Sequence, residues 1–417
     1  DEETDSRVRE LLDAVVSGSD EEVSSSDDWT QTRAGRALMA IINEAIAQNA
    51  TDIHIRAYSE AESGIHYRVD GDFQRRHVIP GETHKRLAGV CKTAAGLNTT
   101  TTVEAQDGSV KLHDRSGNSI TLRVSVIPTL YNRERVVMRI LRSTTGRLLR
   151  LNDLGYYPDE RDEIMKGMAY SAGMVLITGP TGSGKNTTMY AILRETYQSS
   201  RVYLTLEDPI EAVLEFADQV EVSPHISFAK GLRNFLRQDP DVIMVGEIRD
   251  EETAEVASHA AMTGHLLIST LHTNNARDTL LRLEELGVSK LTCAQVVNLL
   301  VAQRLVKRLC PRCREVEGSG MDLVRRYLPA VSPELIEARG YHEQTFYRAH
   351  PQGCSECNRG YVGRMAVPEV VFIDGEFKNL IMDWDMVGFG DLMLKRRLDM
   401  THAAMRRAME GLTSLSE

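Results

Sequence analysis

A glycine-rich segment near the middle of the chain constrains the fold more than any other feature. From Val175 to Thr188 the sequence is VLITGPTGSGKNTT, so an apolar strand pattern enters a run of glycines and a helical pattern follows it. The Walker A phosphate-binding motif requires this order of strand, loop and helix. Gly179, Gly182 and Gly184 allow backbone angles that a Cβ atom would obstruct, so several N–H groups can converge on one phosphate. The sequence therefore predicts a nucleotide-binding α/β domain.

The loop itself supplies the predicted nucleotide contacts. They come from nine consecutive residues, which are Gly179, Pro180, Thr181, Gly182, Ser183, Gly184, Lys185, Asn186 and Thr187. The Lys185 ammonium would contact the β- and γ-phosphates, which favours ATP with Mg²⁺ as the ligand. A strand-to-helix turn without a ligand is the alternative, but it does not account for a lysine directly after the last glycine.

The residue after Lys185 departs from the motif. A Ser or Thr at this position would offer its hydroxyl to Mg²⁺, but this chain has Asn186. An amide oxygen can ligate Mg²⁺ as well, although the side chain is longer, and Thr187 lies about 100° further round the helix. We therefore expect nucleotide binding to be retained and hydrolysis to be weaker. A natural variant and an engineered substitution both fit the sequence.

Composition and charge narrow the class of protein. The chain has 417 residues, enough for two or three domains of roughly 100–200 residues each. Its formal charge of −11 argues against a general nucleic-acid-binding surface, which would be basic, so no nucleic acid is expected as a partner. No apolar run approaches the roughly 20 residues of a membrane helix. The acidic start without Met indicates a piece of a longer protein and no secretory signal.

Apolar periodicity divides the chain into segments. Residues 1–30 are acidic and rich in serine and predict a segment that ends in a linker, with a short helix around 8–16. Residues 31–145 predict an α+β domain, residues 146–155 a linker, and residues 156–417 a parallel sheet with crossover helices. The expected helices of the α+β domain are 32–50 and 84–95, with strands at 52–56, 64–69, 108–113, 119–127 and 134–141. In the last domain the expected strands are 174–178, 202–206, 242–245 and 266–270.

Four of the six cysteines have the spacing of metal ligands. Cys310 and Cys313 form one C-x-x-C pair, and Cys354 and Cys357 form a second after 40 intervening residues. Two such pairs complete a tetrahedral sulfur site, for which Zn²⁺ is the best candidate. A disulfide and free structural thiols are the alternatives. The long intervening segment predicts a helical excursion over residues 321–338.

Three segments downstream of the glycine-rich loop resemble motifs of the secretion ATPase superfamily, in the order of that family. Residues 204–211 (LTLEDPIE) resemble its acidic box, residues 236–250 (LRQDPDVIMVGEIRD) its atypical Walker B strand, and residues 263–273 (TGHLLISTLHT) its histidine box. The chain resembles ATPases of type II secretion and type IV pilus assembly over residues 32–370. The resemblance implies a RecA-like P-loop ATPase domain after a PAS-like α+β domain, a homo-hexamer, and a platform protein of the inner membrane as partner.

The resemblance and the strand ends together assign roles to three carboxylates. Glu247 follows an apolar strand and would orient the attacking water, with a surface ion pair to Arg249 as the alternative. Glu207 and Asp208 also follow a strand end and would hold Mg²⁺ or its waters, or simply cap the turn before Pro209.

Two histidines and two arginines complete the predicted catalytic set. His265 and His272 of the histidine box would sense the γ-phosphate or link neighbouring strands. The resemblance implies that Arg123 and Arg139 of the smaller domain act as arginine fingers, with Arg135 as the rival of Arg139. Such a cation would offset negative charge that develops in the transition state.

The second cysteine pair and its flanks, residues 353–364, resemble the zinc subdomain of extension and secretion motors, which would span about 308–362 here. Retraction motors of pili usually lack it. The resemblance therefore predicts a motor that assembles a pilus or pseudopilus, cytoplasmic and peripheral to the inner membrane. A retraction or DNA-transfer motor is one alternative, and a nucleotide-dependent structural ring, which Asn186 favours, is another. The basic stretch 393–409 is expected to be a solvated helix face, with a contact to acidic lipid or a partner helix as the alternative.

Overall fold

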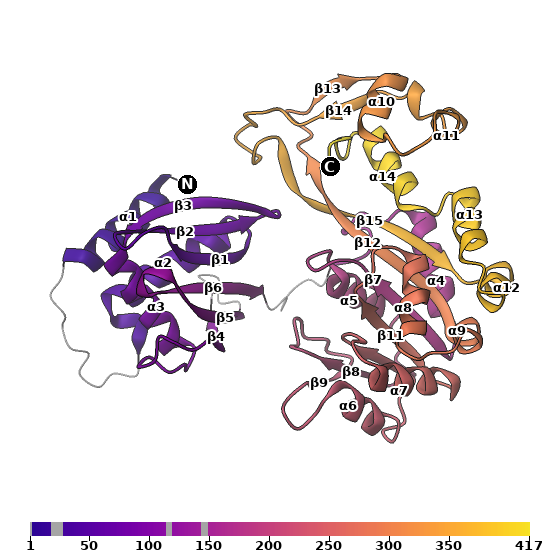
Figure 1. The fold of residues 1–417 in the computed structure, drawn as a ribbon, viewed down its shortest axis with the longest axis horizontal. Coiled ribbons are helices and arrows are strands. Elements are labelled where there is room, and N and C mark those ends of the chain that lie inside the picture. The colour runs from indigo at the N-terminus through magenta and orange to yellow at the C-terminus, as the bar shows by residue number, and fades with distance from the viewer. Residues whose placement is uncertain (1, 18–27, 114–118, 143–148) are drawn as a thin grey trace. The chain divides into compact units, whose positions relative to one another are not determined.

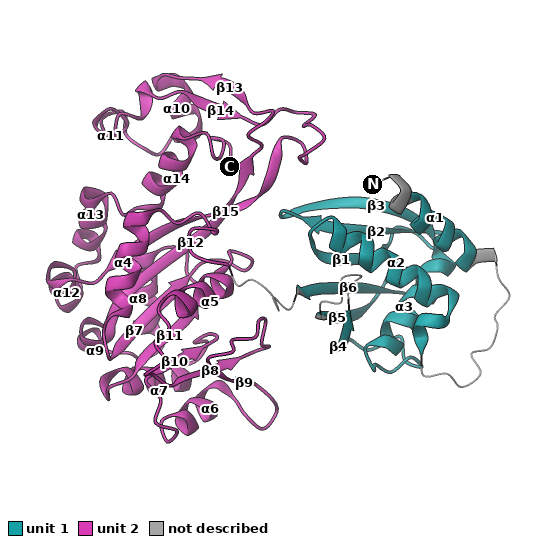
Figure 2. Ribbon diagram, turned by 180° about the vertical axis from the view of Figure 1, so that it is seen from behind, with its two compact units in different colours: residues 1–145 teal, residues 146–417 magenta. Residues whose placement is uncertain are grey.

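The computed structural model describes residues 2–17, 28–113, 119–142 and 149–417. It divides into two compact units, unit 1 at residues 1–145 and unit 2 at residues 146–417 (Figures 1 and 2). Residues 18–27 of the predicted segment 1–30 and residues 146–148 of the predicted linker 146–155 lie outside the described part of the chain. Each unit has its own sheet and its own apolar core, so each is described by itself.

Unit 1 is a six-stranded antiparallel sheet with helices packed on one face, in the strand order β3-β2-β1-β6-β5-β4 (Figure 1). Its elements are α1 (Glu2–Ser17), α2 (Arg33–Ala47), β1 (Ala50–Ala57), β2 (Glu62–Val69), β3 (Asp72–Pro80), α3 (Gly81–Ala94), β4 (Gln106–His113), β5 (Ser119–Thr129) and β6 (Arg133–Arg142). Ile53 and Met138 from the strands share one core with Leu38 and Leu87 from the helices. Because strand residues alternate between faces, Asp52 points to the face opposite this core.

The helix predicted over residues 32–50 is too long, because α2 ends at Ala47. Asn49 has a φ of +56°, a left-handed conformation that stops a helix. Ala50 then begins β1 and pairs with Val69 of β2. The sequence pattern also gives no strand at β3, which pairs with β2 along its whole length.

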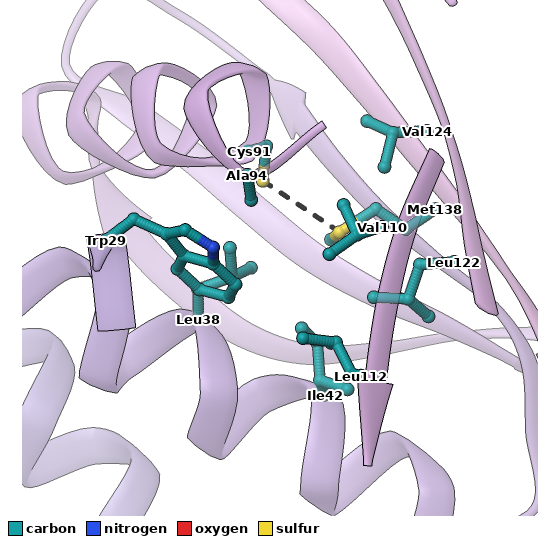
Figure 3. A pocket seen from close by; sticks show the side chains of 10 residues that line it. All are labelled: Trp29, Leu38, Ile42, Cys91, Ala94, Val110, Leu112, Leu122, Val124 and Met138. Atoms are coloured by element: carbon teal, nitrogen blue, oxygen red, sulfur yellow. Dashed lines mark hydrogen bonds between the residues drawn. The ribbon is translucent and has the colours of Figure 1, made fainter. Parts of the chain in front are cut away.

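An apolar pocket lies between the helices and the β4-β5-β6 side of the sheet in unit 1 (Figure 3). Its lining is entirely hydrophobic and consists of Trp29, Leu38, Ile42, Cys91, Ala94, Val110, Leu112, Leu122, Val124 and Met138. The Cys91 thiol lies 3.9 Å from the Met138 sulfur, and burial raises the pKa of this thiol to about 12. Cys91 is therefore a core residue and not a reactive thiol.

Unit 2 is built on a seven-stranded sheet in the order β15-β12-β7-β11-β10-β8-β9. Its strands are β7 (Gly173–Thr178), β8 (Tyr203–Glu207), β9 (Asp218–Glu221), β10 (Val242–Val245), β11 (Leu266–Leu271), β12 (Val297–Leu309) and β15 (Tyr361–Phe372). All neighbours are parallel except β12 and β15, which form an antiparallel pair. Strands β7, β10 and β11 are buried along their full length, which explains their uninterrupted apolar sequences.

Helices cover both faces of this sheet, and the apolar clusters on the two faces are separate. The helices are α4 (Pro158–Met168), α5 (Lys185–Glu195), α6 (Phe228–Phe235), α7 (Glu251–Met262), α8 (Ala276–Glu285), α9 (Lys290–Val296), α12 (Gly375–Met382), α13 (Met386–Arg396) and α14 (Met400–Met409). In a parallel sheet the carboxyl ends of the strands meet at one edge, and that edge is the usual place for a ligand.

Strands β12 and β15 extend beyond the main sheet and lead into a small lobe (Figure 1). The lobe contains β13 (Glu315–Gly318), α10 (Met321–Tyr327), α11 (Pro333–Ala338) and β14 (Phe346–Arg348). The two helices occupy the segment for which an excursion is predicted. Val324, Ile336 and Phe346 form a core there with Met405 of α14, so the C-terminal helix supports the lobe.

The expectation of a solvated face over residues 393–409 is wrong at Arg407. This side chain is fully buried, and its guanidinium donates to both carboxylate oxygens of Glu160 at 3.1 and 2.8 Å. It also donates to the carbonyl of Gly155 at 2.7 Å. A buried arginine is tolerated only when it is paired in this way, so α14 is fixed to the start of α4.

Candidate nucleotide and metal sites

The glycine-rich loop connects the end of β7 to the start of α5. Gly179, Gly182 and Gly184 have φ values of +150°, +80° and +83°, and Gly184 caps the helix. A Cβ atom at Gly179 would lie 2.3 Å from the carbonyl oxygen of Gln303, so the loop packs too closely for any other residue. The loop and the helix N-terminus together form the anion-binding geometry that the motif predicts.

Lys185 lies against the loop and is only 7% exposed. Its ammonium donates to the carbonyl of Gly179 at 2.8 Å and to that of Pro180 at 3.3 Å. The Nδ1 atom of His272 is 3.5 Å away. Burial lowers the pKa of Lys185, and the nearby Glu247 carboxylate opposes that shift. The charge is thus held at the base of the loop, where a phosphate would bind.

His272 connects the lysine to Glu247. Its Nε2 atom lies 3.1 Å from Glu247 Oε2, so the ring can accept from Lys185 at Nδ1 and donate to the carboxylate at Nε2. Glu247 also pairs with Arg249, which reaches Asp208 at 3.4 Å. Residues that follow β7, β8, β10 and β11 are therefore joined in one polar chain at the carboxyl edge of the sheet.

The environment of Glu247 keeps its carboxylate ionised. Burial alone would raise the pKa, but the hydrogen bonds and charges of Arg249 and His272 outweigh it and lower the pKa below the ordinary value. The ion pair with Arg249, the alternative for this residue, is present. It does not exclude the other role, because an ionised carboxylate that already accepts hydrogen bonds is suited to orient a water molecule.

Glu207 ends β8 and has a different environment. It is 3% exposed and accepts hydrogen bonds from Thr205 at 2.5 Å, from Gln219 at 2.9 Å and from the Tyr190 hydroxyl. Burial is the largest influence and raises the pKa of this carboxyl group despite those bonds. The donors to Glu207 come from α5, β8 and β9 and not from the turn before Pro209, so this network is not a turn cap. The Glu207 oxygens are also already occupied by hydrogen bonds, which is not the arrangement expected of a magnesium ligand.

The structure does not bring His265 to this edge of the sheet. His265 precedes β11 and His272 follows it, and β11 runs parallel to β7 from Leu266 beside Gly173 to Leu271 beside Thr178. A six-residue strand is roughly 20 Å long, so His265 lies far from the loop of the same chain. Its carbonyl accepts from Gly173 N at 3.1 Å, which is the strand-linking role that the sequence left open. The prediction that His265 senses a γ-phosphate bound to the loop of its own chain is therefore wrong.

Asn186 lies on the first turn of α5 and is partly exposed. Its Nδ2 atom donates to Glu211 Oε1 at 2.8 Å, and Glu211 belongs to the segment that follows β8. Thr187 is exposed, and it lies about 100° further round the helix than Asn186.

The predicted arginine fingers lie in unit 1, on the face opposite its core. Arg123 of β5 and Arg139 of β6 are directly opposite each other in the strand register. Arg139 is fixed by Asp52, whose Oδ1 accepts from Nε at 3.0 Å, yet its side chain is 56% exposed. Its rival Arg135 is less exposed and lies 3.4 Å from the ring of His54.

Gln303 is a functional residue that the sequence reasoning missed. It is buried on β12, and its Nε2 atom donates to the Ser183 carbonyl of the loop at 2.6 Å. Its Oε1 atom accepts from Tyr156 at 2.5 Å and from Thr188 at 2.7 Å. One amide therefore joins the loop, helix α5 and the start of unit 2. Its only signal in the sequence is that it follows the apolar run 299–302, with Arg304 directly after it.

The four cysteines of the two pairs lie together where β12 ends and β15 begins. Their sulfur atoms are all within 4.8 Å of one another, with 3.8 Å between Cys310 and Cys354 and 3.6 Å between Cys313 and Cys357. Burial would raise the pKa of Cys310, but N–H groups of residues 312 and 313 lower it to about 7, which favours the thiolate. Four sulfur donors at this spacing fit a tetrahedral zinc site.

A parallel sheet with a Walker A loop at its carboxyl edge defines a P-loop nucleotide-binding protein. Residues 30–417 match the family described as "Type II/IV secretion system protein", and the chain belongs to this family. The resemblance predicted from the motifs is thereby confirmed.

Relatives and solved structures agree with this assignment. The chain is 38% identical over 390 residues to the type IV pilus assembly ATPase PilB of Acinetobacter baylyi, covering 90% of this chain and 64% of that protein. It is 35% identical to the type II secretion system ATPase E of Vibrio cholerae, covering 99% and 82%. The pilus retraction motor PilT with bound ADP is 26% identical, with a TM-score of 0.59 and coverage of 90% and 94%. The ATPase DotB of Legionella pneumophila, at 24% identity, has a TM-score of 0.67 with 95% of each chain covered, and the predicted α/β fold class is confirmed.

None of the helices within the described ranges is long and apolar enough to cross a membrane.

Proposed function

We propose that this chain is an ATPase motor that powers assembly of a type IV pilus or a type II secretion pseudopilus. The observation that carries the proposal is the polar chain from Lys185 through His272 to Glu247, which lies at the glycine-rich loop. It combines a phosphate-binding cation with an ionised carboxylate that can orient water. The names of the relatives, pilus assembly ATPase and secretion ATPase, support the same activity.

Each part of the site has a separate role in the proposed hydrolysis. The backbone N–H groups of residues 179 and 181–187 and the Lys185 ammonium bind and orient the phosphates of ATP. Glu247 positions water, and Arg123 and Arg139 offset charge on the transferred phosphoryl group. The proposed ligands of Mg²⁺ or its waters are Asn186, Asp208 and Glu207, and of these the Glu207 carboxyl group is buried and already accepts hydrogen bonds from neighbouring side chains. When bound, Mg²⁺ would neutralise phosphate charge there.

The proposal extends to assembly and location. We infer a ring of six chains, a platform protein of the inner membrane as partner, and a cytoplasmic, peripheral position. The names of the family and of the relatives, which refer to pilus assembly and secretion, support this part of the proposal. The chain spans 64% of the Acinetobacter protein, so activities of that whole protein are part of the proposal. We assign Zn²⁺ to the four cysteines, where it would hold the small lobe together.

Two other functions keep a specific observation in their favour. A retraction or DNA-transfer motor is favoured by the structural match to PilT, while the four-cysteine cluster favours assembly. A nucleotide-dependent structural ring with weak hydrolysis is favoured by Asn186. Phosphate release from ATP by the purified chain, compared with the Asn186→Thr variant, distinguishes a motor from the structural ring. Measurable hydrolysis with both supports the motor, and its absence from both with a membrane partner present supports the structural ring.

A further inference from the structure

Asn186 and Glu211 form a pair whose geometry bears on how the site selects a cation. The Asn186 Nδ2 atom donates to Glu211 Oε1 at 2.8 Å. A carboxylate only accepts hydrogen bonds, so the bond fixes which end of the amide is nitrogen. The amide oxygen, Oδ1, is left as the atom of Asn186 that can serve as a ligand.

The two ends of the Asn186 amide can thus do what the hydroxyl group does in the usual motif. A Ser or Thr after the lysine offers a lone pair to Mg²⁺ and still has a proton to donate to a nearby carboxylate. Asn186 has the same two functions on two different atoms, Oδ1 and Nδ2. The amide differs in one respect, because rotation by 180° would present its NH₂ group, which repels a cation. An amide at this position therefore needs a partner that prevents the rotation.

Glu211 is itself fixed against the same helix. Its backbone N–H donates to the Tyr190 hydroxyl at 3.2 Å, and Tyr190 lies one turn after Asn186 on α5. The Tyr190 hydroxyl also donates to Glu207. Two contacts along one face of α5 thus hold the segment after β8, so the carboxylate of Glu211 has a defined position relative to the amide.

We propose that Glu211 is a positioning residue for the metal-bound nucleotide: it holds the Asn186 amide with its oxygen available to the divalent cation. In this role Glu211 acts through Asn186. The inference rests on the proposed nucleotide site and explains how a chain without the usual hydroxyl retains a cation ligand.

The test measures the affinity of the full chain for a fluorescent, non-hydrolysable ATP analogue in Mg²⁺ and in EDTA. For Glu211→Ala we expect the affinity in Mg²⁺ to fall about tenfold, the effect of one charge-assisted hydrogen bond, and the affinity in EDTA to stay within about twofold. Glu211→Gln keeps an acceptor for Nδ2 and should stay within about threefold in both. Glu215→Ala removes the same charge from an exposed residue of the same segment and serves as the matched control.

The same substitution in the Asn186→Thr variant tests whether Glu211 acts by positioning the Asn186 amide. A threonine hydroxyl can rotate without presenting a wrong atom, so Glu211→Ala should cost less than about threefold when combined with Asn186→Thr. Equal losses for Glu211→Gln and Glu211→Ala, or equal losses in Mg²⁺ and EDTA, would overturn the inference, since charge or folding would then be the cause. If the wild-type chain bound the analogue neither in Mg²⁺ nor in EDTA, the proposed nucleotide site would be overturned, and the inference with it.

Discussion

The nucleotide site and the four-cysteine cluster both depend on strand β12, at two positions seven residues apart. Gln303 in the middle of the strand supports the glycine-rich loop through three hydrogen bonds. Cys310 directly follows the strand and begins the cysteine cluster. The loop is thus shaped by the protein itself, whereas the cysteines present four sulfur atoms that repel one another once ionised. The loop therefore has its shape before a ligand binds, and we expect the cysteine cluster to be stabilised by its metal.

Loss of the metal from the four-cysteine cluster should give the largest change in stability. If it gave none, the contrast between the two sites would not hold. Structural zinc sites contribute apparent binding energies of about 10–16 kcal/mol in small domains. We expect Cys313→Ser to abolish zinc binding and to make residues 314–353 sensitive to protease, while the nucleotide affinity of the loop changes little. Elemental analysis and limited proteolysis measure both outcomes, with Cys91→Ala as a control outside the cluster. Less than about half an equivalent of zinc per wild-type chain would count against the site.

The second effect concerns Lys185, the cation at the base of the loop. Lys185→Ala should lower kcat/KM for ATP by at least about 10³-fold, because phosphate binding and charge stabilisation are both lost. The zinc content should stay at the wild-type level. Steady-state phosphate release measures the rate, and Lys230→Ala on α6 is the matched control with an exposed lysine. A fall of less than about tenfold would show that the loop does not bind the phosphates as proposed.

Glu247 separates chemistry from binding within the same site. Glu247→Gln keeps the shape of the side chain but removes the charge that we propose orients water, so kcat should fall about 10²-fold. The affinity for the nucleotide should change by less than about threefold, since this carboxylate is not expected to contact the phosphates. If both quantities fell together, the role of Glu247 would be to hold His272 and Lys185 in place.

Gln303 tests whether the loop is indeed supported by the protein. Gln303→Ala leaves the Ser183 carbonyl, the Tyr156 hydroxyl and the Thr188 hydroxyl without their partner. We expect the free energy of unfolding of unit 2 to fall by about 2 kcal/mol, from one buried amide with three hydrogen bonds. Urea denaturation measures this change against Gln344→Ala, which alters an exposed glutamine. An unchanged stability would mean that the loop holds its shape without β12.

The sequence predicted local features well, because each depends on residues close together in the chain. The loop, the strands around it and the two cysteine pairs belong to this group. Strand β12 escaped prediction because its first half is buried on both faces and shows no alternation, and Gln303 was missed with it. His265 precedes the predicted strand 266–270, so its place at the amino end of that strand was available from the sequence, and only the resemblance assigned it a contact with phosphate. Arg407 is buried by a partner 247 residues away, and no local pattern contains that contact.

The smallest effect comes from the two glutamates at neighbouring strand ends, whose pKa values are shifted in opposite directions. For Glu207 the folded pKa is raised, so the folded state favours the protonated group. The stability this contributes is fully present below the ordinary value of 4.5 and is lost as the pH rises through the folded pKa. Glu207→Gln cannot ionise and lacks that loss, so its stability relative to wild type should increase between pH 5 and pH 8, by less than the Gln303→Ala effect.

Glu247 should give the opposite change of stability with pH, so it serves as the control for Glu207. Its folded pKa is lowered, so its contribution is present above pH 4.5 and is lost as the pH falls through the folded pKa. Relative to wild type, Glu247→Gln should therefore become less destabilising toward acid. Urea denaturation measures the two slopes, between pH 5 and pH 8 for Glu207→Gln and from pH 5 downward for Glu247→Gln. Slopes of the same sign would mean that Arg249 and His272 do not offset the burial of Glu247, and the polar chain at the loop would then lack its ionised member.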